Sequence, residues 1–127
     1  MKFSTRTEYG LRALTSLAKV YPNSLPLTRI AEDNHLSKAY LERLFAILKK
    51  LKVITSVKGK YGGYLLTQKP NQVKLDKVVK ALEGSMAPYA CVESNLGCPA
   101  CSLRKVWLKL DKSINNTLAS VSLRDLV

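Results

Sequence analysis

The sequence predicts a mainly α-helical fold with one small β-hairpin and a long C-terminal helix. The first observation behind this prediction is a pair of short amphipathic segments, at 26–36 and 38–51, joined by a tight turn. The second is a pair of strand-forming runs around a glycine-rich tip, "VITSVKGKYGGYLLT". The third is a series of apolar residues at spacings of four and three near the C-terminus, which favours a helix with a narrow apolar seam.

The first half of the chain is expected to contain three helices. A broad apolar stripe predicts a helix that begins near residue 4 and ends at Pro22, with Thr5 and Glu8 at capping-box spacing. A short second helix follows, with Thr28 as its N-cap residue. Ser37 is expected to cap a third helix whose outer face is basic. The apolar face of this third helix consists of Leu41, Leu44, Phe45, Leu48 and Leu51.

The segment "SVKGKYGGYLL" follows the third helix directly, and its position decides its interpretation. A phosphate-binding loop would end in Gly-Lys-Ser/Thr and lead into a helix, whereas Gly63 leads into a strand-like run. Two short helices followed by a basic hairpin predict a winged helix-turn-helix. We expect this DNA-binding domain over 1–84, ending in a helix stopped by Gly84, then a cysteine-bearing loop over 85–102. A dimerisation helix and a C-terminal turn, capped by Ser122 with Asp125, are expected over 103–127.

The charge of the chain narrows the class of partner. Its 127 residues include 21 Lys and Arg against 9 Asp and Glu, a formal net charge of +12. Nucleic acid or an anionic membrane would neutralise this charge, but there is no long apolar run for a membrane, so double-stranded DNA is favoured. Charges run through the N-terminus, which predicts a cytoplasmic protein without a signal peptide. No acid–base pair is evident, so we expect no enzyme.

Three groups of residues are candidates for contact with DNA. The start of a recognition helix presents its side chains to base edges, and the later basic residues of that helix are expected at phosphates. At the wing, backbone at a glycine and a lysine in the minor groove are expected to approach the sugar-phosphate strand. The sole histidine, His35, is interpreted as a turn or packing residue. The candidates are Ser37, Lys38, Ala39, Tyr40 and Glu42 for bases, Arg43, Lys49 and Lys50 for phosphates, and Lys58, Gly59 and Lys60 at the wing.

Three cysteines, Cys91, Cys98 and Cys101, lie in the predicted loop with the spacing C-x6-C-x2-C. Thiolates are ligands for zinc or an iron–sulfur cluster. Structural zinc generally takes four ligands, whereas three cysteines and one ligand from elsewhere suit a cluster with an exchangeable fourth position. Free thiols, or a redox switch between Cys98 and Cys101, are the alternatives without metal. Spacing alone leaves cluster and zinc open.

The order of these motifs resembles the Rrf-two family of bacterial winged-helix regulators, of the IscR, NsrR, RirA and CymR type. The resemblance spans nearly the whole chain and rests on the pieces "MKFSTRTEYGLRAL", "LSKAYLERLFAILKK", "ITSVKGKYGGYLL", "VVKALEG" and the cysteine loop with "LRKVW" and "SLRDLV". No single piece is specific, but their order and spacing together are.

The resemblance implies a homodimeric transcriptional regulator, in particular a repressor, that binds a palindromic operator. The C-terminal helices of the two copies would cross, so the dimerisation candidates are the seam residues Leu103, Trp107, Leu110, Ile114 and Leu118. By position, Ser37, Tyr40 and Glu42 match the base-contacting start of the recognition helix. Lys58 stands where relatives often have an arginine that enters the minor groove, and Ala39 replaces a serine that contacts DNA in IscR-like proteins.

The resemblance also implies an iron–sulfur cluster on Cys91, Cys98 and Cys101, with 2Fe–2S favoured over 4Fe–4S. IscR-like members place a histidine ligand where this chain has Arg104. NsrR-like members use an acidic residue of the first helix, supplied by the partner subunit, and Glu8 occupies that position. A capping-box role for Glu8 is the equal alternative. CymR-like relatives imply the other reading, a cluster-free regulator that senses through thiol chemistry or a partner protein.

Overall fold

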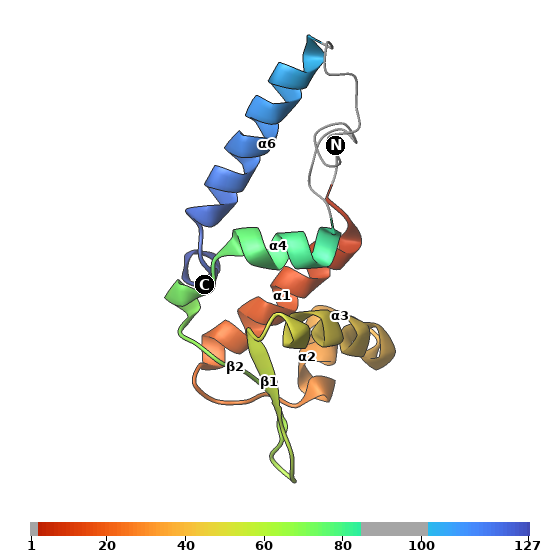
Figure 1. The fold of residues 1–127 in the computed structure, drawn as a ribbon. Coiled ribbons are helices and arrows are strands. Elements are labelled where there is room, and N and C mark those ends of the chain that lie inside the picture. Colours follow the sequence, from red (N-terminus) through yellow and green to blue (C-terminus); the bar gives the residue numbers. More distant parts are fainter. Residues whose placement is uncertain (1–2, 85–101) are drawn as a thin grey trace.

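The computed structural model describes residues 3–84 and 102–127 (Figure 1). Its elements confirm a mainly helical chain with one hairpin. The chain runs through α1 (Thr5–Val20), α2 (Leu27–Asn34), α3 (Lys38–Lys50), β1 (Ile54–Val57), β2 (Gly63–Leu66), η1 (Pro70–Gln72), α4 (Leu75–Glu83), α6 (Leu103–Ala119) and η2 (Leu123–Leu126). The cysteines at 91, 98 and 101, and almost all of the predicted 85–102 loop, lie outside the described residues.

Two of the predicted helix caps are wrong. Helix α1 begins one residue after Ser4, and Thr5 lies inside the helix instead of capping it. The Ser4 hydroxyl donates to Oε2 of Glu83 at 2.7 Å, so this serine connects α1 to α4. Helix α2 begins after Pro26, whose fixed φ suits a helix start, and Thr28 lies within its first turn. The spacing of residues along the chain could not reveal these helix starts. Pro26 occupies the N-cap position of α2, and the N-cap residue of α1 is bonded to the distant carboxylate of Glu83.

One hydrophobic core holds the helices together. Phe45 of α3 is fully buried, and its ring lies 4.7 Å from that of Tyr64 in β2, measured between centroids, in an edge-to-face arrangement. Gly10 of α1 faces Leu82 of α4, and a Cβ there would lie 2.6 Å from a Leu82 methyl carbon, so the two helices pack closely. The predicted apolar face of α3 is confirmed, with Leu51 half-buried at its end. The fully buried side chains include Leu14, Leu17, Ile30, Leu41, Leu44, Leu48, Ile54, Leu82 and Leu123.

The hairpin pairs β1 and β2 antiparallel, with Ile54 opposite Leu66 and Val57 opposite Gly63. Strand β2 is bonded to the loop that precedes α2: the backbone groups of Leu25 and Tyr64 exchange two hydrogen bonds, each of 2.9 Å. The hairpin is therefore tied to the helical body through this loop and projects from it, as Figure 1 shows.

The C-terminal turn returns to the body. A bridge between Lys74 and Ser122 places η2 beside the start of α4, and Leu123 is fully buried in the core. The backbone N–H of Ser122 donates to Oδ2 of Asp125 at 2.9 Å, which confirms the predicted capping box.

Helix α6 differs from the other helices because its apolar residues are exposed or half-buried. It projects away from the body in Figure 1 and contacts it through α4 near its C-terminal end. Within the described part of the chain no residue of α6 is buried. Leu103 and Leu110 of the predicted seam are 54% and 38% exposed, Trp107 and Ile114 are half-buried, and Leu118 packs against the core. Among the described helices, none combines the length and the apolar character needed to cross a bilayer.

Candidate nucleic-acid interface

The start of α3 is fixed by its cap. Ser37 adopts extended backbone angles, and its Oγ accepts a hydrogen bond of 3.2 Å from the backbone N–H of Tyr40, as predicted. Ser37, Lys38 and Ala39 are exposed, so the first turn of α3 is open to a partner. His35 closes the preceding turn with left-handed backbone angles, φ 55° and ψ 44°, which confirms that it is a turn residue.

Tyr40 differs from its neighbours because it is half-buried. Its ring meets Tyr9 of α1 edge to face, with 6.1 Å between centroids. The guanidinium carbon of Arg43 lies 6.0 Å from the centre of the same ring, at the range of a cation–π contact. Tyr40 therefore connects the exposed start of α3 to α1 and orients Arg43, so its predicted contact with DNA would involve the exposed part of the ring.

The remaining candidate residues of α3, one acidic and three basic, continue along its outer face. Glu42, Arg43, Lys49 and Lys50 are exposed. The ammonium group of Lys49 donates to Oγ of Ser56 in β1 at 3.1 Å, which connects the end of α3 to the hairpin. Because α3 and the hairpin are joined in this way, a duplex held by one lies within reach of the other. The individual DNA contacts of these residues stay predictions.

The hairpin tip presents Lys58, Gly59 and Lys60 to solvent. Gly59 has a φ of +112°, which an L side chain rarely adopts, and there is open space where its Cβ would be. The tip also carries Tyr61, which sequence reasoning missed and which is 83% exposed. A bulky aromatic residue between a lysine and two glycines, with no buried strand position to fill, is the signal that would have found it.

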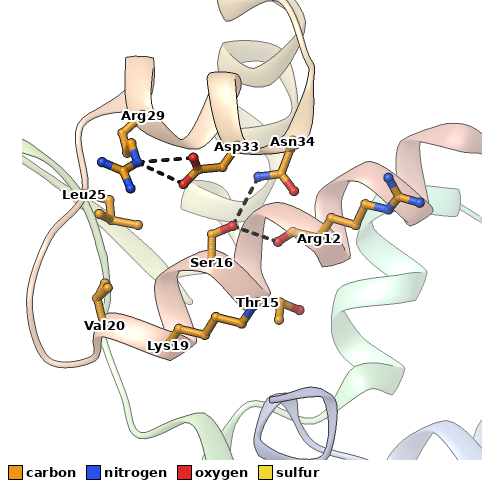
Figure 2. A pocket seen from close by; sticks show the side chains of 9 residues that line it. All are labelled: Arg12, Thr15, Ser16, Lys19, Val20, Leu25, Arg29, Asp33 and Asn34. Carbon is orange, nitrogen blue, oxygen red and sulfur yellow. Dashed lines mark hydrogen bonds and ion pairs between the residues drawn. The ribbon is translucent and has the colours of Figure 1, made fainter.

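A groove of about 660 Å³ lies between α1 and α2 (Figure 2). Three cations and one acid line it, together with hydroxyl and amide groups, and Leu25 and Val20 form its apolar part. Arg29 Nε lies 3.2 Å from both carboxylate oxygens of Asp33, an i,i+4 ion pair on the outer face of α2. The lining residues are Arg12, Thr15, Ser16, Lys19, Val20, Leu25, Arg29, Asp33 and Asn34.

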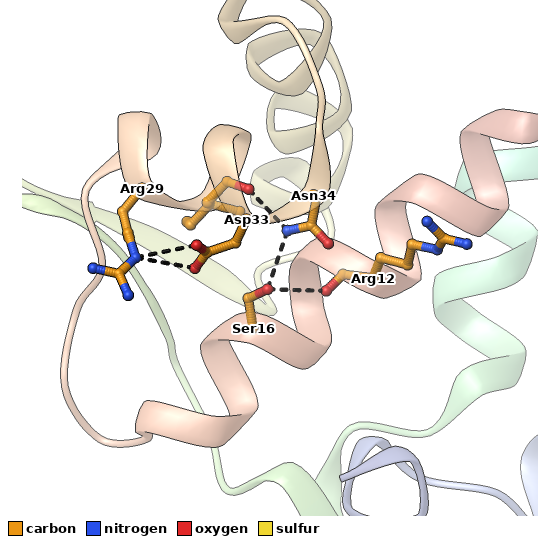
Figure 3. A network of polar contacts seen from close by, with 6 residues as sticks. Arg12, Ser16, Arg29, Asp33 and Asn34 are labelled. Carbon is orange, nitrogen blue, oxygen red and sulfur yellow. Dashed lines mark hydrogen bonds and ion pairs between the residues drawn. The ribbon is translucent and has the colours of Figure 1, made fainter.

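A polar network at one edge of this groove joins the two helices (Figure 3). The Asn34 amide donates to Ser16 Oγ at 3.1 Å and to the Ile30 carbonyl at 2.8 Å. The Ser16 hydroxyl in turn donates to the carbonyl of Arg12 at 3.3 Å. This network fixes the C-terminal end of α2, and with it the turn that leads into α3. Periodicity cannot predict it, since the partners lie on different helices.

Of the predicted cluster ligands, only Glu8 lies among the residues that the structure describes. Its carboxylate lies 2.7 Å from the Arg12 guanidinium, and both side chains are more than half exposed. The capping-box alternative is wrong, because Glu8 pairs along the helix with Arg12 instead of capping it. Arg104, where IscR-like proteins have histidine, lies in the first turn of α6 and has no free nitrogen lone pair for a metal. Across residues 3–84 and 102–127, no three His, Cys, Asp or Glu side chains are grouped to hold a metal ion.

Among the described residues, the acidic group with a perturbed pKa is Glu83, which lies away from these candidates at the contact of α1 with α4. Burial alone would raise the pKa of Glu83, but hydrogen bonds from the Ser4 hydroxyl and backbone N–H hold that pKa below its ordinary value. The ionised carboxylate therefore stabilises the start of α1, and this effect concerns stability, not DNA recognition.

The helix-turn-helix, the cationic wing and the projecting C-terminal helix define a winged-helix DNA-binding protein. Comparison with known proteins makes the class specific: the family model Rrf2, described as "Iron-dependent Transcriptional regulator", matches residues 3–127. The chain belongs to the Rrf2 family of transcriptional regulators, which bind DNA and are not enzymes.

Relatives of two kinds are similar to the chain. The HTH-type transcriptional regulator CymR of Bacillus subtilis (strain 168) is 35% identical over 99% of this chain and 89% of CymR. Its solved structure, titled "the Global Cysteine Regulator of B. subtilis", matches with a TM-score of 0.83 at 33% identity, covering 99% of this chain and 95% of that one. The structure of IscR from T. potens matches with a TM-score of 0.82 at 34% identity, covering 99% and 85%.

Proposed function

We propose that the chain is a homodimeric, cytoplasmic transcriptional repressor that binds a palindromic operator and holds an iron–sulfur cluster on Cys91, Cys98 and Cys101. The observation that carries the DNA-binding part is the pairing of an open, capped first turn of α3 with a cationic hairpin joined to it through Lys49 and Ser56. We assign base contacts to Ser37, Lys38, Ala39, Tyr40 and Glu42, backbone contacts to Arg43 and Lys49, and wing contacts to Lys58, Gly59 and Lys60.

The dimer is supported by the exposed apolar side chains of α6. A second copy would cover the seam of Leu103, Trp107, Leu110, Ile114 and Leu118. Within one chain Leu103 and Leu110 stay exposed, and Trp107 and Ile114 are only half-buried. A two-fold pair of recognition helices requires an operator with two matching half-sites about one helical turn apart. We therefore expect the domain boundaries at 84 and 102 to separate DNA binding from dimerisation.

The cluster is supported by the chemistry of its donors. Three thiolates suit iron, and a weak fourth ligand leaves one iron exchangeable. Glu8, from the partner subunit, is the proposed fourth ligand, because it is exposed at the first turn of α1 and its ion pair with Arg12 lies on the surface. We favour 2Fe–2S over 4Fe–4S. The cluster would supply a labile sensor between the DNA-binding domain and α6, so its loss would change the spacing of the two α3 helices.

The experiment is anaerobic purification, followed by an absorbance spectrum, iron and sulfide assays, and binding to a duplex that the chain selects from a random-sequence library. The expected result is a brown dimer whose affinity for the duplex changes when the cluster is removed. Cys98→Ala should be colourless and bind with one fixed affinity, and the matched control Ser102→Ala should stay brown. Regulation that persists unchanged in Cys98→Ala would refute the sensor role.

Glu8→Ala tests the fourth ligand separately. We expect it to bind iron but to lose it faster to a chelator, because one ligand position is then open to water. Arg12→Ala, which removes the ion-pair partner and leaves the carboxylate, is the matched control and should retain iron at least as long as the unaltered chain. Equal rates of loss in all three proteins would exclude Glu8 as a ligand.

A second candidate is a cluster-free regulator that senses through thiol chemistry or a partner protein. It is favoured by the similarity to CymR, titled a cysteine regulator, which is as close in identity as the similarity to IscR. Its signature would be a colourless, iron-free protein after anaerobic purification. Under the thiol version, oxidation would form a Cys98–Cys101 disulfide, and duplex affinity would respond to oxidant in the unaltered chain but not in Cys101→Ser.

A further inference from the structure

We propose that Tyr61, at the tip of the β1–β2 hairpin, packs its ring against the sugar walls of the DNA minor groove at an A·T step. This inference rests on the proposed DNA-binding function and adds to it a residue that sets affinity and base preference.

The exposure of Tyr61 is the first argument. At 83%, it is the most exposed large apolar side chain among the residues that the structure describes. Tyr61 follows Lys60 directly and shares the hairpin tip with Lys58, and both lysines are exposed. A partner that suits this tip must present apolar surface next to negative charge. The minor groove does so, because its walls are deoxyribose and its rims are two rows of phosphates.

The tip is also rigidly supported. The backbone N–H of Gly62 donates to the Gly59 carbonyl at 3.0 Å, and the Ser24 hydroxyl donates to the Tyr61 carbonyl at 3.3 Å. Gly62 and Gly63 have no room for a side chain, since a Cβ would collide with the backbone carbonyls of Val57 and Leu25. Because the backbone under Tyr61 is already ordered, placing the ring in a groove fixes little beyond its own two torsions.

Lys60 gives the ring a charged neighbour. Its ammonium nitrogen lies 5.8 Å from the centre of the Tyr61 ring, at cation–π range. The two side chains would thus enter the groove together, the ring against sugars and the ammonium toward phosphates or base acceptors. Their contributions differ in salt dependence, because only the ammonium displaces counterions.

The preference for A·T follows from the shape of the groove floor. Guanine places an amino group in the minor groove, whereas A·T pairs present only acceptors there. A ring that enters the groove would meet this amino group, so a G·C pair under the wing should weaken binding.

Salt-dependent anisotropy titrations separate the two side chains. The full chain, purified anaerobically, and its variants are titrated onto the duplex selected from a random-sequence library. Tyr61→Ala should bind roughly tenfold more weakly at every salt concentration, with an unchanged slope of log K against log salt. Lys60→Ala should reduce the magnitude of the slope by about 0.9. Tyr61→Phe should bind as the unaltered chain does, because the ring suffices, and Phe3→Ala, another exposed aromatic at 54%, is the matched control.

Substitution of inosine in the duplex tests whether the Tyr61 ring enters the minor groove. At the A·T pair beneath the wing, located by hydroxyl-radical footprinting, an I·C pair keeps the A·T pattern of the minor groove and a G·C pair adds the amino group. We expect I·C to be tolerated and G·C to weaken binding about fivefold, and this penalty to vanish in Tyr61→Ala.

Two results would overturn the inference: affinity of Tyr61→Ala within twofold of the unaltered chain, or an equal G·C penalty in both proteins. Either would leave the ring to another partner, such as a protein surface. Failure of the unaltered chain to bind any duplex is a different outcome, since it would overturn the proposed function itself.

Discussion

The helical body buries apolar residues in its core, whereas helix α6 leaves its own exposed or half-buried. In the body, side chains from α1, α2, α3 and α4 meet in one core, and even the C-terminal turn contributes the fully buried Leu123. In α6, Leu103 and Leu110 of the proposed seam are both more than a third exposed. The core of the body is therefore complete within one chain, whereas in the proposed dimer a second chain would cover the exposed seam of α6. Apolar periodicity alone predicts the helices of both regions equally well. It does not say whether an apolar face is buried within its own chain, by folding, or against another chain, by assembly.

The largest effect should come from the body. Phe45→Ala removes a fully buried ring that packs on Tyr64, and we expect it to lower the free energy of unfolding by about 3–5 kcal/mol. Urea denaturation at fixed protein concentration measures this. Phe45→Leu, which keeps most of the volume, should lose less than half as much. Similar losses from both would mean that the ring is not a central part of the core.

The next effect tests α6. Leu110→Asp places a charge in the proposed seam, where burial without a partner is unfavourable, and should convert the dimer to a monomer. Affinity for the selected duplex should then fall on the order of 100-fold, while the circular dichroism of the body is retained. Leu108→Asp is the matched control, because Leu108 is 40% exposed against 38% for Leu110 but lies on another side of the helix. It should stay dimeric.

A smaller effect is expected where α2 meets α1. Asn34→Ala removes the two hydrogen bonds from its amide and leaves the Ile30 carbonyl and Ser16 hydroxyl without that donor. We expect a loss of about 1–2 kcal/mol in the free energy of unfolding, measured in urea. Arg29→Ala removes an exposed ion pair on the same helix and should cost less than about 0.5 kcal/mol. If Arg29→Ala costs the more of the two, the network is not what holds α2.

The smallest effect concerns pH. The pKa of Glu83 is lower in the folded chain than in the unfolded one, so its contribution is present above the unfolded pKa and is lost as pH falls through the folded pKa. Glu83→Gln should therefore cost less than about 1 kcal/mol at pH 7, since the group is partly exposed, and nothing well below the folded pKa. Urea denaturation at both pH values checks this. A cost that does not change with pH would assign the effect to packing.

Local signals predicted the parts of the fold that depend on neighbours in sequence. The Ser37 cap, the turn at His35, the hairpin and the capping box of Ser122 with Asp125 each involve residues a few positions apart. The cap of α1 was mispredicted because Ser4 bonds to Glu83, which is 79 residues away. The network of Asn34 with Ser16 was missed for the same reason.

The candidate site divides in a similar way. The exposed lysines of the wing follow from composition and position, but the half-buried state of Tyr40 depends on Tyr9 of another helix. Tyr61 was missed because aromatic residues are usually counted toward the core, and only the structure shows that this ring has no core to enter. The role of the three cysteines stays a prediction, since they lie outside the described residues.

Native mass spectrometry of the anaerobically purified chain with its selected duplex is the sharpest test of the proposed dimer on DNA. We expect two copies of the 14.1 kDa chain on each duplex, and loss of that species in Leu110→Asp. A single copy bound per duplex, with unchanged affinity in Leu110→Asp, would contradict this dimer.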